Sequence, residues 1–139
     1  MTTATLSPSS AKVKFRLAGG AQPLILLPVE VDGEGPFEFI LDTGAGTSLL
    51  SSELGQKLGI KILGSKEGQS DVDVTAGVLQ SFQVGGARIH NLAVVAADFF
   101  AMLNNALGAK LDGIVGCNFL RNYKVALDYP NETLSLFTP

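Results

Sequence analysis

The stretch Phe37-Glu38-Phe39-Ile40-Leu41-Asp42-Thr43-Gly44-Ala45 decides the fold. Its first five residues form a mostly apolar, strand-like run, and Asp42 follows directly. Gly44 allows the chain to turn sharply, so the sequence predicts an aspartate presented on a turn at the end of a buried strand. A second apolar-apolar-glycine signal, Ile114-Val115-Gly116, comes later in the chain, while Asp-Thr-Gly-Ala occurs once.

Strand patterns precede this stretch. Val13, Phe15 and Leu17 alternate with basic residues, which predicts a strand with one wet face. Leu24–Val31 predicts a second, more apolar strand. The turn-forming residues 32–36 predict a hairpin between Leu24–Val31 and Phe37–Leu41. The chain is therefore expected to reach Asp42 from a central strand.

A short helix is predicted after the aspartate, over Ser51–Leu58. Ser51 or Ser52 suits the N-cap, Leu54 and Leu58 lie one turn apart, and Gly59 suits the left-handed position after the last turn. We interpret Asp98–Lys110 as a loose stretch. The remaining predicted elements are strands over Val78–Val84, Arg88–Ala96 and Leu111–Gly116, a short helix over Asn118–Asn122, and a closing hairpin of Tyr123–Tyr129 with Thr133–Phe137.

These elements predict a mostly β chain with two short helices, and the length predicts one domain. The chain has 139 residues, which suits a single domain over 11–139 behind a flexible, Thr/Ser/Pro-rich arm over 1–10. Hydrophobic residues make up 46%, charged residues 17%, and the net charge is −3. Without a cluster of Lys and Arg to neutralise phosphates, nucleic-acid binding is disfavoured.

Other function classes are excluded by what the sequence lacks. One cysteine, Cys117, permits no disulfide within the chain, and one histidine, His90, disfavours a histidine metal cluster or a Ser-His-Asp triad. No apolar run approaches the roughly 18 residues that a membrane span needs. We expect a soluble protein of the cytoplasm, or of the periplasm or cell envelope if a signal segment has been removed, and the sequence does not choose between these.

The quoted motifs resemble those of the retropepsin-like aspartic proteases, the single-domain group that includes retroviral proteases and bacterial aspartyl-protease domains. The resemblance covers roughly residues 24 to 137. It depends on the following stretches in this order: Phe39–Ala45, Leu54–Gly59, Val84–Gly86, Leu111–Leu120 and Val125–Tyr129. It implies a closed β-barrel with one lobe per chain.

The resemblance also implies a catalytic site shared by two chains. Because the chemistry needs two facing carboxylates and the motif occurs once, Asp42 is expected to supply both, one from each subunit of a homodimer. Thr43 is expected to hydrogen-bond across the pair, and Gly44 and Ala45 to complete the loop. Ile114 and Val115 are expected to pack beneath it, with Gly116 leaving room.

A flap that covers polypeptide substrate is expected within 64–77. Its tip is placed at Gly68-Gln69-Ser70-Asp71, with Thr75-Ala76-Gly77 as the second choice. The aspartates at 71 and 73 alternate with Val72 and Val74, a pattern more typical of the solvent face of a strand than of a cation site. No metal and no cofactor are expected.

Two other residues have competing interpretations. Asp112 is expected to have a loop role rather than to act as a second acid, and Cys117 to be a buried core thiol rather than a nucleophile. The alternative to an endopeptidase is a peptide-binding or dimerisation module of the same fold that turns over little or nothing.

Overall fold

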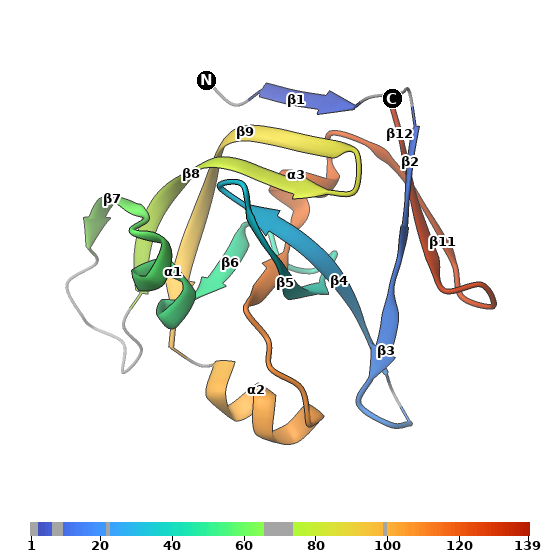
Figure 1. Ribbon diagram of the computed structural model, residues 1–139, viewed down its shortest axis with the longest axis horizontal. Coiled ribbons are helices and arrows are strands. Elements are labelled where there is room, and N and C mark those ends of the chain that lie inside the picture. The colour runs from blue at the N-terminus through green and yellow to red at the C-terminus, as the bar shows by residue number, and fades with distance from the viewer. Residues whose placement is uncertain (1–2, 7–9, 22, 66–73, 99) are drawn as a thin grey trace.

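The computed structural model describes residues 3–6, 10–21, 23–65, 74–98 and 100–139 (Figure 1). Within these residues the strands are β1 (Thr3–Leu6), β2 (Ser10–Lys14), β3 (Arg16–Ala18), β4 (Leu24–Val31), β5 (Glu34–Leu41), β6 (Ser48–Ser51), β7 (Lys61–Ser65), β8 (Val74–Val84), β9 (Ala87–Ala97), β10 (Gly113–Val115), β11 (Lys124–Asp128) and β12 (Thr133–Phe137). The helices are α1 (Ser52–Leu58), α2 (Phe100–Leu107) and α3 (Cys117–Leu120).

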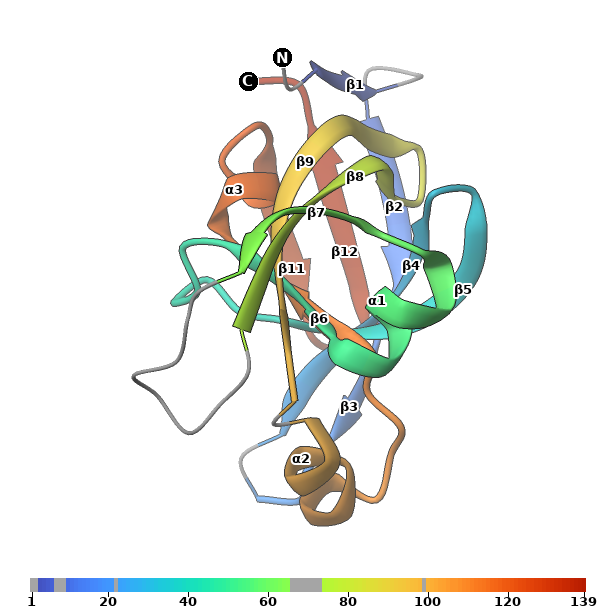
Figure 2. The ribbon, with the colours of Figure 1, turned by 90° about the vertical axis from the view of Figure 1, so that its left-hand side faces the viewer.

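In the described part of the chain, six strands close into a barrel. They follow the order β9-β6-β10-β5-β4-β8, and β8 pairs back onto β9. β1, β3 and β7 attach to β9, β4 and β8 respectively. In Figures 1 and 2 the long β8–β9 hairpin covers one end of the barrel and α2 lies at the other. The mostly β, retropepsin-like barrel predicted from the sequence is confirmed.

The predicted hairpin between β4 and β5 is also confirmed, with an even tighter turn. The strands pair antiparallel, and Asp32 and Gly33 have φ values of 51° and 80°. Left-handed values at both turn residues suit a two-residue hairpin, because this turn twists in the same sense as the strands. The Asp32 carboxylate also accepts a hydrogen bond from the Ser81 amide at 3.1 Å.

β10 lies between two strands that are consecutive in the sequence. It pairs parallel with β5, with Ile114 beside Ile40, and antiparallel with β6, with Ile114 beside Leu49. The connection between β5 and β6, residues 42–47, must therefore cross the end of β10. This crossing positions the site described below.

Side chains alternate between the two faces of these strands and form two apolar clusters. The barrel interior contains Phe39, Phe82 and Phe119, whose ring centroids lie 5.4 and 5.3 Å apart in succession. Leu26, Ile40, Ile114 and Leu49 neighbour one another across four strands, and they belong to the second cluster. α2 covers this second cluster through Phe100, Leu103 and Leu107.

The interpretation of Asp98–Lys110 as a loose stretch is wrong, because it contains α2. Phe100 is 2% exposed, and Leu103 and Leu107 are half-buried at helical spacing. The helix ends where Gly108 adopts a φ of 64° and donates its amide proton to the carbonyl of Asn104. With α2, the described chain has a third helix besides the two predicted ones.

The N-terminal part also departs from the prediction. Within the expected flexible arm, Thr3–Leu6 forms β1, which pairs antiparallel with β9 because that strand offers a free edge there. Thr5 donates a side-chain hydrogen bond to the carbonyl of Arg88. The strand predicted around Val13–Leu17 is divided into β2 and β3, which join different sheets. None of the helices in the described residues is long and apolar enough to cross a membrane.

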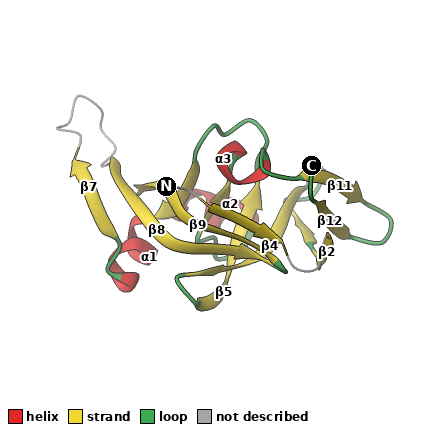
Figure 3. Ribbon diagram, turned by 90° about the horizontal axis from the view of Figure 1, so that it is seen from above, coloured by secondary structure: helices red, strands yellow, loops and turns green. Residues whose placement is uncertain are grey.

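The C-terminal hairpin matches its prediction. β11 and β12 pair antiparallel, and β12 pairs with β2, so these strands form a separate sheet in the order β11-β12-β2. Figure 3 shows this sheet at the opposite side of the molecule from β7 and α1.

Candidate active site

Asp42 lies directly after β5 and continues its pairing with β10. Its amide donates a hydrogen bond to the carbonyl of Val115 at 3.0 Å. The side chain is half-buried, and its Oδ1 accepts a hydrogen bond from the Gly44 amide at 2.8 Å. Alternation along the strand puts Asp42 on the face of Ile40, the face that α2 covers. The backbone therefore fixes both the position and one hydrogen bond of this carboxylate.

Gly116 allows the loop to approach the end of β10 closely, and Gly44 leaves room beside the Asp42 carboxylate. A Cβ atom on Gly116 would lie 2.8 Å from the carbonyl oxygen of Thr47 and 2.9 Å from that of Ala45. A Cβ atom on Gly44 would lie 3.2 Å from Asp42 Oδ1. The contact at Gly116 involves backbone atoms that cannot rotate away, so any larger residue there would push the 42–47 loop outward.

The start of α3 is hydrogen-bonded to the loop. The Cys117 amide donates to the carbonyl of Ala45 at 2.7 Å, and the Asn118 amide donates to that of Gly46 at 3.2 Å. Cys117 is half-buried rather than a core residue, and its Sγ donates to the carbonyl of Thr43 at 2.9 Å. The Thr43 residue itself is exposed. Through these hydrogen bonds, Thr43, Ala45 and Gly46 of the loop are attached to Cys117 and Asn118 at the start of α3.

Two residues of this arrangement escaped the sequence analysis. Ser48 is 0% exposed, and its Oγ accepts a hydrogen bond from the Gly116 amide at 2.9 Å. Asn118 accepts hydrogen bonds from both the amide and the hydroxyl of Ser48, each at 2.8 Å. The only available signal was their position: Asn118 lies in the motif Leu111–Leu120, two residues after Gly116, and Ser48 follows Asp42 by six residues.

Asp112 has the expected structural role. Its Oδ2 accepts a hydrogen bond from the Glu38 amide at 3.1 Å, and its own amide donates to the carbonyl of Glu38 at 2.8 Å. The two hydrogen bonds join the residue before β10 to β5, directly before the first paired residues, Gly113 and Phe39. Ile114 and Val115 are buried in β10, at 8% and 0% exposure.

The predicted flap tip, Gly68-Gln69-Ser70-Asp71, lies outside the described residues. The strands on either side of it, β7 and β8, pair antiparallel. The second choice, Thr75-Ala76-Gly77, is wrong as a flap tip. These three residues belong to β8 and pair with β7 on one side and β9 on the other, so they cannot be the end of a loop.

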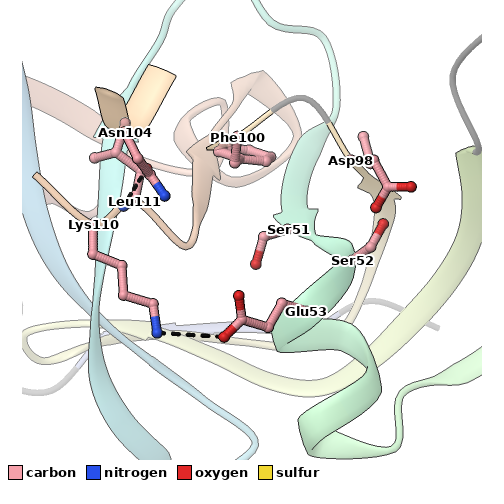
Figure 4. Close-up of a pocket in the computed structure, with 9 residues that line it drawn as sticks. Ser51, Ser52, Glu53, Asp98, Phe100, Asn104, Lys110 and Leu111 are labelled. Atoms are coloured by element: carbon pink, nitrogen blue, oxygen red, sulfur yellow. Dashed lines mark hydrogen bonds and ion pairs between the residues drawn. The ribbon is translucent and has the colours of Figure 1, made fainter. Parts of the chain in front are cut away.

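A cavity of about 200 Å³ lies at the other end of β6 from Asp42 (Figure 4). Its lining includes Ser51, Asp98 and Phe100, and the ion pair between Lys110 and Glu53, with 3.6 Å between Nζ and Oε1, stands beside it. Among the side chains that the structure describes, no group of three or more His, Cys, Asp or Glu is arranged to hold a metal ion. The cavity is separate from the loop of Asp42.

The closed barrel, the inserted β10 and the aspartate on the crossing loop together define the class of retropepsin-like aspartic proteases. The model of the aspartyl protease family matches residues 27–119, and the chain belongs to that family. No curated protein matches the sequence significantly.

Solved structures resemble this chain in fold. A retropepsin-like aspartic protease from Rickettsia conorii has a TM-score of 0.61 at 19% identity, covering 98% of this chain and 93% of its own. The retroviral protease-like domain of Ddi1 from Leishmania major has a TM-score of 0.58 at 15% identity, covering 84% of this chain and 94% of its own. At these identities the likeness concerns the fold.

Proposed function

We propose that this protein is an aspartic endopeptidase whose active site forms between two copies of the chain. The observation that carries the proposal is Asp42 itself, half-buried and hydrogen-bonded to Gly44, on a loop that is anchored to β10 and α3. Membership of the aspartyl protease family supports this role for the carboxylate.

The proposed chemistry needs two Asp42 carboxylates that face each other. Two carboxylates a few ångströms apart cannot easily both ionise, so they share one proton. The ionised carboxylate takes a proton from a bridging water, and that water attacks the scissile carbonyl carbon. The protonated partner donates its proton to the carbonyl oxygen, which gives a tetrahedral intermediate. The C–N bond of this intermediate then breaks as the carboxyl group that took the water proton passes it to the amide nitrogen and the other carboxylate takes a proton back from a hydroxyl of the intermediate. Thr43 is proposed to stabilise the pair through its hydroxyl, and the segment around 68–71 to cover the substrate.

A second copy of the chain is the proposed source of the second aspartate. The closed six-stranded barrel corresponds to one lobe, and its crossing loop carries one Asp-Thr-Gly sequence. Among the described large apolar side chains, the exposed ones concentrate in the hairpin of β11 and β12, where Val125, Leu127, Tyr129 and Phe137 are 37%, 40%, 52% and 36% exposed. Exposed apolar surface of this kind suits a subunit contact.

The edge strand β11 is self-complementary. If two copies pair antiparallel about Ala126, Lys124 faces Asp128 of the other copy and Val125 faces Leu127 of the other copy. Cross-strand pairs of opposite charge and of apolar side chains each contribute roughly 0.2–1 kcal/mol. The edge of β11 that does not pair with β12 is therefore the proposed subunit contact.

The test compares wild-type protein with Asp42→Asn on an unfolded polypeptide at acidic to mildly acidic pH. We expect cleavage by the wild type, inhibition by pepstatin-like transition-state mimics, and loss of cleavage in Asp42→Asn with unchanged circular dichroism. Asp98→Asn, which changes an exposed aspartate outside the loop, serves as the matched control and retains activity.

Three outcomes would contradict the proposal. The first is equal activity of wild type and Asp42→Asn. The second is inhibition by chelators but not by the transition-state mimic. The third is a wild-type protein that binds peptides without cleaving them, which would support the binding module instead.

A further inference from the structure

Ser48, which is buried, and Asn118, which is half-buried, form a hydrogen-bonded unit directly behind the loop of Asp42. Ser48 is the first residue of β6, so it receives the chain where the 42–47 loop ends. Its hydroxyl accepts from the Gly116 amide at 2.9 Å and donates to Asn118 Oδ1 at 2.8 Å. With its amide also bonded to Asn118 Oδ1, Ser48 has partners for its amide and for both roles of its hydroxyl.

Asn118 connects α3 to two regions that are distant from it in the sequence, residues 46–48 and β9. Its side-chain oxygen binds the start of β6, its side-chain Nδ2 donates to the carbonyl of Ala93 in β9 at 2.6 Å, and its backbone amide donates to the carbonyl of Gly46 in the loop. An asparagine side chain offers an acceptor and a donor side by side. No aliphatic residue of similar size can reproduce these contacts.

The unit acts on the part of the loop that Asp42 does not fix itself. The first half of the loop is held by the Asp42 amide, which donates to the carbonyl of Val115, and by the Gly44 amide, which donates to the Asp42 side chain. The second half ends at Ser48, and the side chain of Ser48 fixes Gly116, over which Ala45 and Thr47 pass closely. Without the hydroxyl, the Gly116 amide would be left buried without this partner, which disfavours the present arrangement.

We propose that Ser48 and Asn118 are positioning residues of the active site, holding the 42–47 loop so that the Asp42 carboxylate is directed for catalysis. This inference depends on the proposed function. The effect is on geometry, since the two side chains bond to each other and to the backbone of Ser48, Gly116 and Ala93 rather than to the carboxylate. Small displacements of a catalytic group are costly, and about 1 Å can reduce the rate roughly 100-fold.

The experiment compares Asn118→Ala with Asn122→Ala. Both asparagines donate side-chain hydrogen bonds to backbone carbonyls, but Asn122 binds the carbonyls of Asn118 and Phe119 at the end of α3, away from the loop. We expect Asn118→Ala to lower kcat roughly 10- to 100-fold with KM within about twofold. Asn122→Ala retains kcat. Both are measured at a protein concentration and temperature where each variant is folded and dimeric.

A second pair of variants tests whether the two side chains act together. Ser48→Ala is expected to lower kcat as Asn118→Ala does, and the double variant Ser48→Ala/Asn118→Ala to lose less than the product of the two single losses, because the hydrogen bond between the two side chains is already broken in either single variant. Multiplicative losses, an unchanged kcat in Asn118→Ala, or equal losses in Asn118→Ala and Asn122→Ala would overturn the proposal.

Amide hydrogen exchange separates this inference from the proposed function. If the wild-type protein proves inactive, the endopeptidase proposal fails, but the loop geometry remains measurable. Faster exchange of the Gly44 and Ala45 amides in Asn118→Ala, and not in Asn122→Ala, would support the positioning role. Equal exchange in both variants would overturn it.

Discussion

Tyr123 is a polar residue in the apolar core. It is 8% exposed, its ring centroid lies 5.2 Å from that of Phe119, and its hydroxyl donates to the carbonyls of Thr5 at 3.2 Å and Arg88 at 3.4 Å. Burial raises the pKa of Tyr123 to about 12. This hydroxyl also ties β1 to the body of the molecule, which helps to explain why the N-terminal segment is a strand.

The raised pKa predicts an alkaline limit of stability. The pKa of an unfolded tyrosine is about 10. Below pH 10 the phenol is neutral in both states and the full free energy of unfolding is present; as pH rises from 10 toward 12 this free energy falls, because only the unfolded state loses the proton readily. The absorbance of phenolate, recorded against pH for wild type and Tyr123→Phe, should differ by one step centred at about 12. A difference centred near 10 would contradict a buried, neutral phenol.

At the residue scale, the sequence analysis identified the residues of the candidate site whose contacts are local in the chain. Asp42 and Gly44 could be identified because their contact spans two residues and a turn requires it. Ser48 and Asn118 could not, because their hydrogen bonds cross 70 residues and form only when β10 enters between β5 and β6. Contacts of this range depend on topology, which a single sequence specifies weakly.

Elements with strong end signals were predicted with nearly the right limits. α1 begins where the Ser51 side chain accepts a hydrogen bond from the Leu54 amide and ends where Gly59 adopts a φ of 63° and a ψ of 42°. α2 has neither acidic residues in its first turn nor basic ones in its last. It is stabilised by packing on Leu26, Ile40 and Ile114, and its sequence signals, Gly108 after the last turn and the helical spacing of Phe100, Leu103 and Leu107, were overlooked.

The helix cap predicts a measurable difference between two neighbouring serines. Ser51→Ala removes the acceptor for the Leu54 amide and should lower the free energy of unfolding by about 1 kcal/mol. Ser52→Ala, in the first turn itself, should change it by a few tenths of a kcal/mol at most, because alanine favours the helix. Urea unfolding curves of both variants provide the comparison, and equal losses would show that Ser51 does not act as a cap.

At the scale of the whole molecule, closing the barrel satisfies the edges of six strands and leaves the C-terminal sheet apart. β11 is the outermost strand of that sheet, and all five of its residues are exposed. Val125 and Leu127 lie opposite Leu136 and Leu134, which are buried, so the apolar face of β12 continues onto β11 and there meets solvent. An apolar edge of this kind is prone to pair with another strand.

If this surface is the contact of the proposed dimer, the dimer should dissociate on dilution and Leu127→Lys should weaken it. Because each proposed active site needs two chains, activity per chain should fall as the protein is diluted. Leu127→Lys places a charge within the proposed contact and should raise the dimer dissociation constant at least about 10-fold, which corresponds to roughly 1.4 kcal/mol. Leu17→Lys is the matched control, since Leu17 in β3 is 37% exposed against 40% for Leu127.

Sedimentation velocity over a range of concentrations, with activity measured in the same samples, distinguishes the outcomes. The control variant should dissociate and lose activity at the same concentrations as the wild type, whereas Leu127→Lys should do both at higher ones. Equal weakening by the two substitutions would show that β11 is not the interface, but it would not exclude a dimer. A monomeric wild type with constant activity per chain would contradict the shared site itself, because one chain supplies a single Asp42.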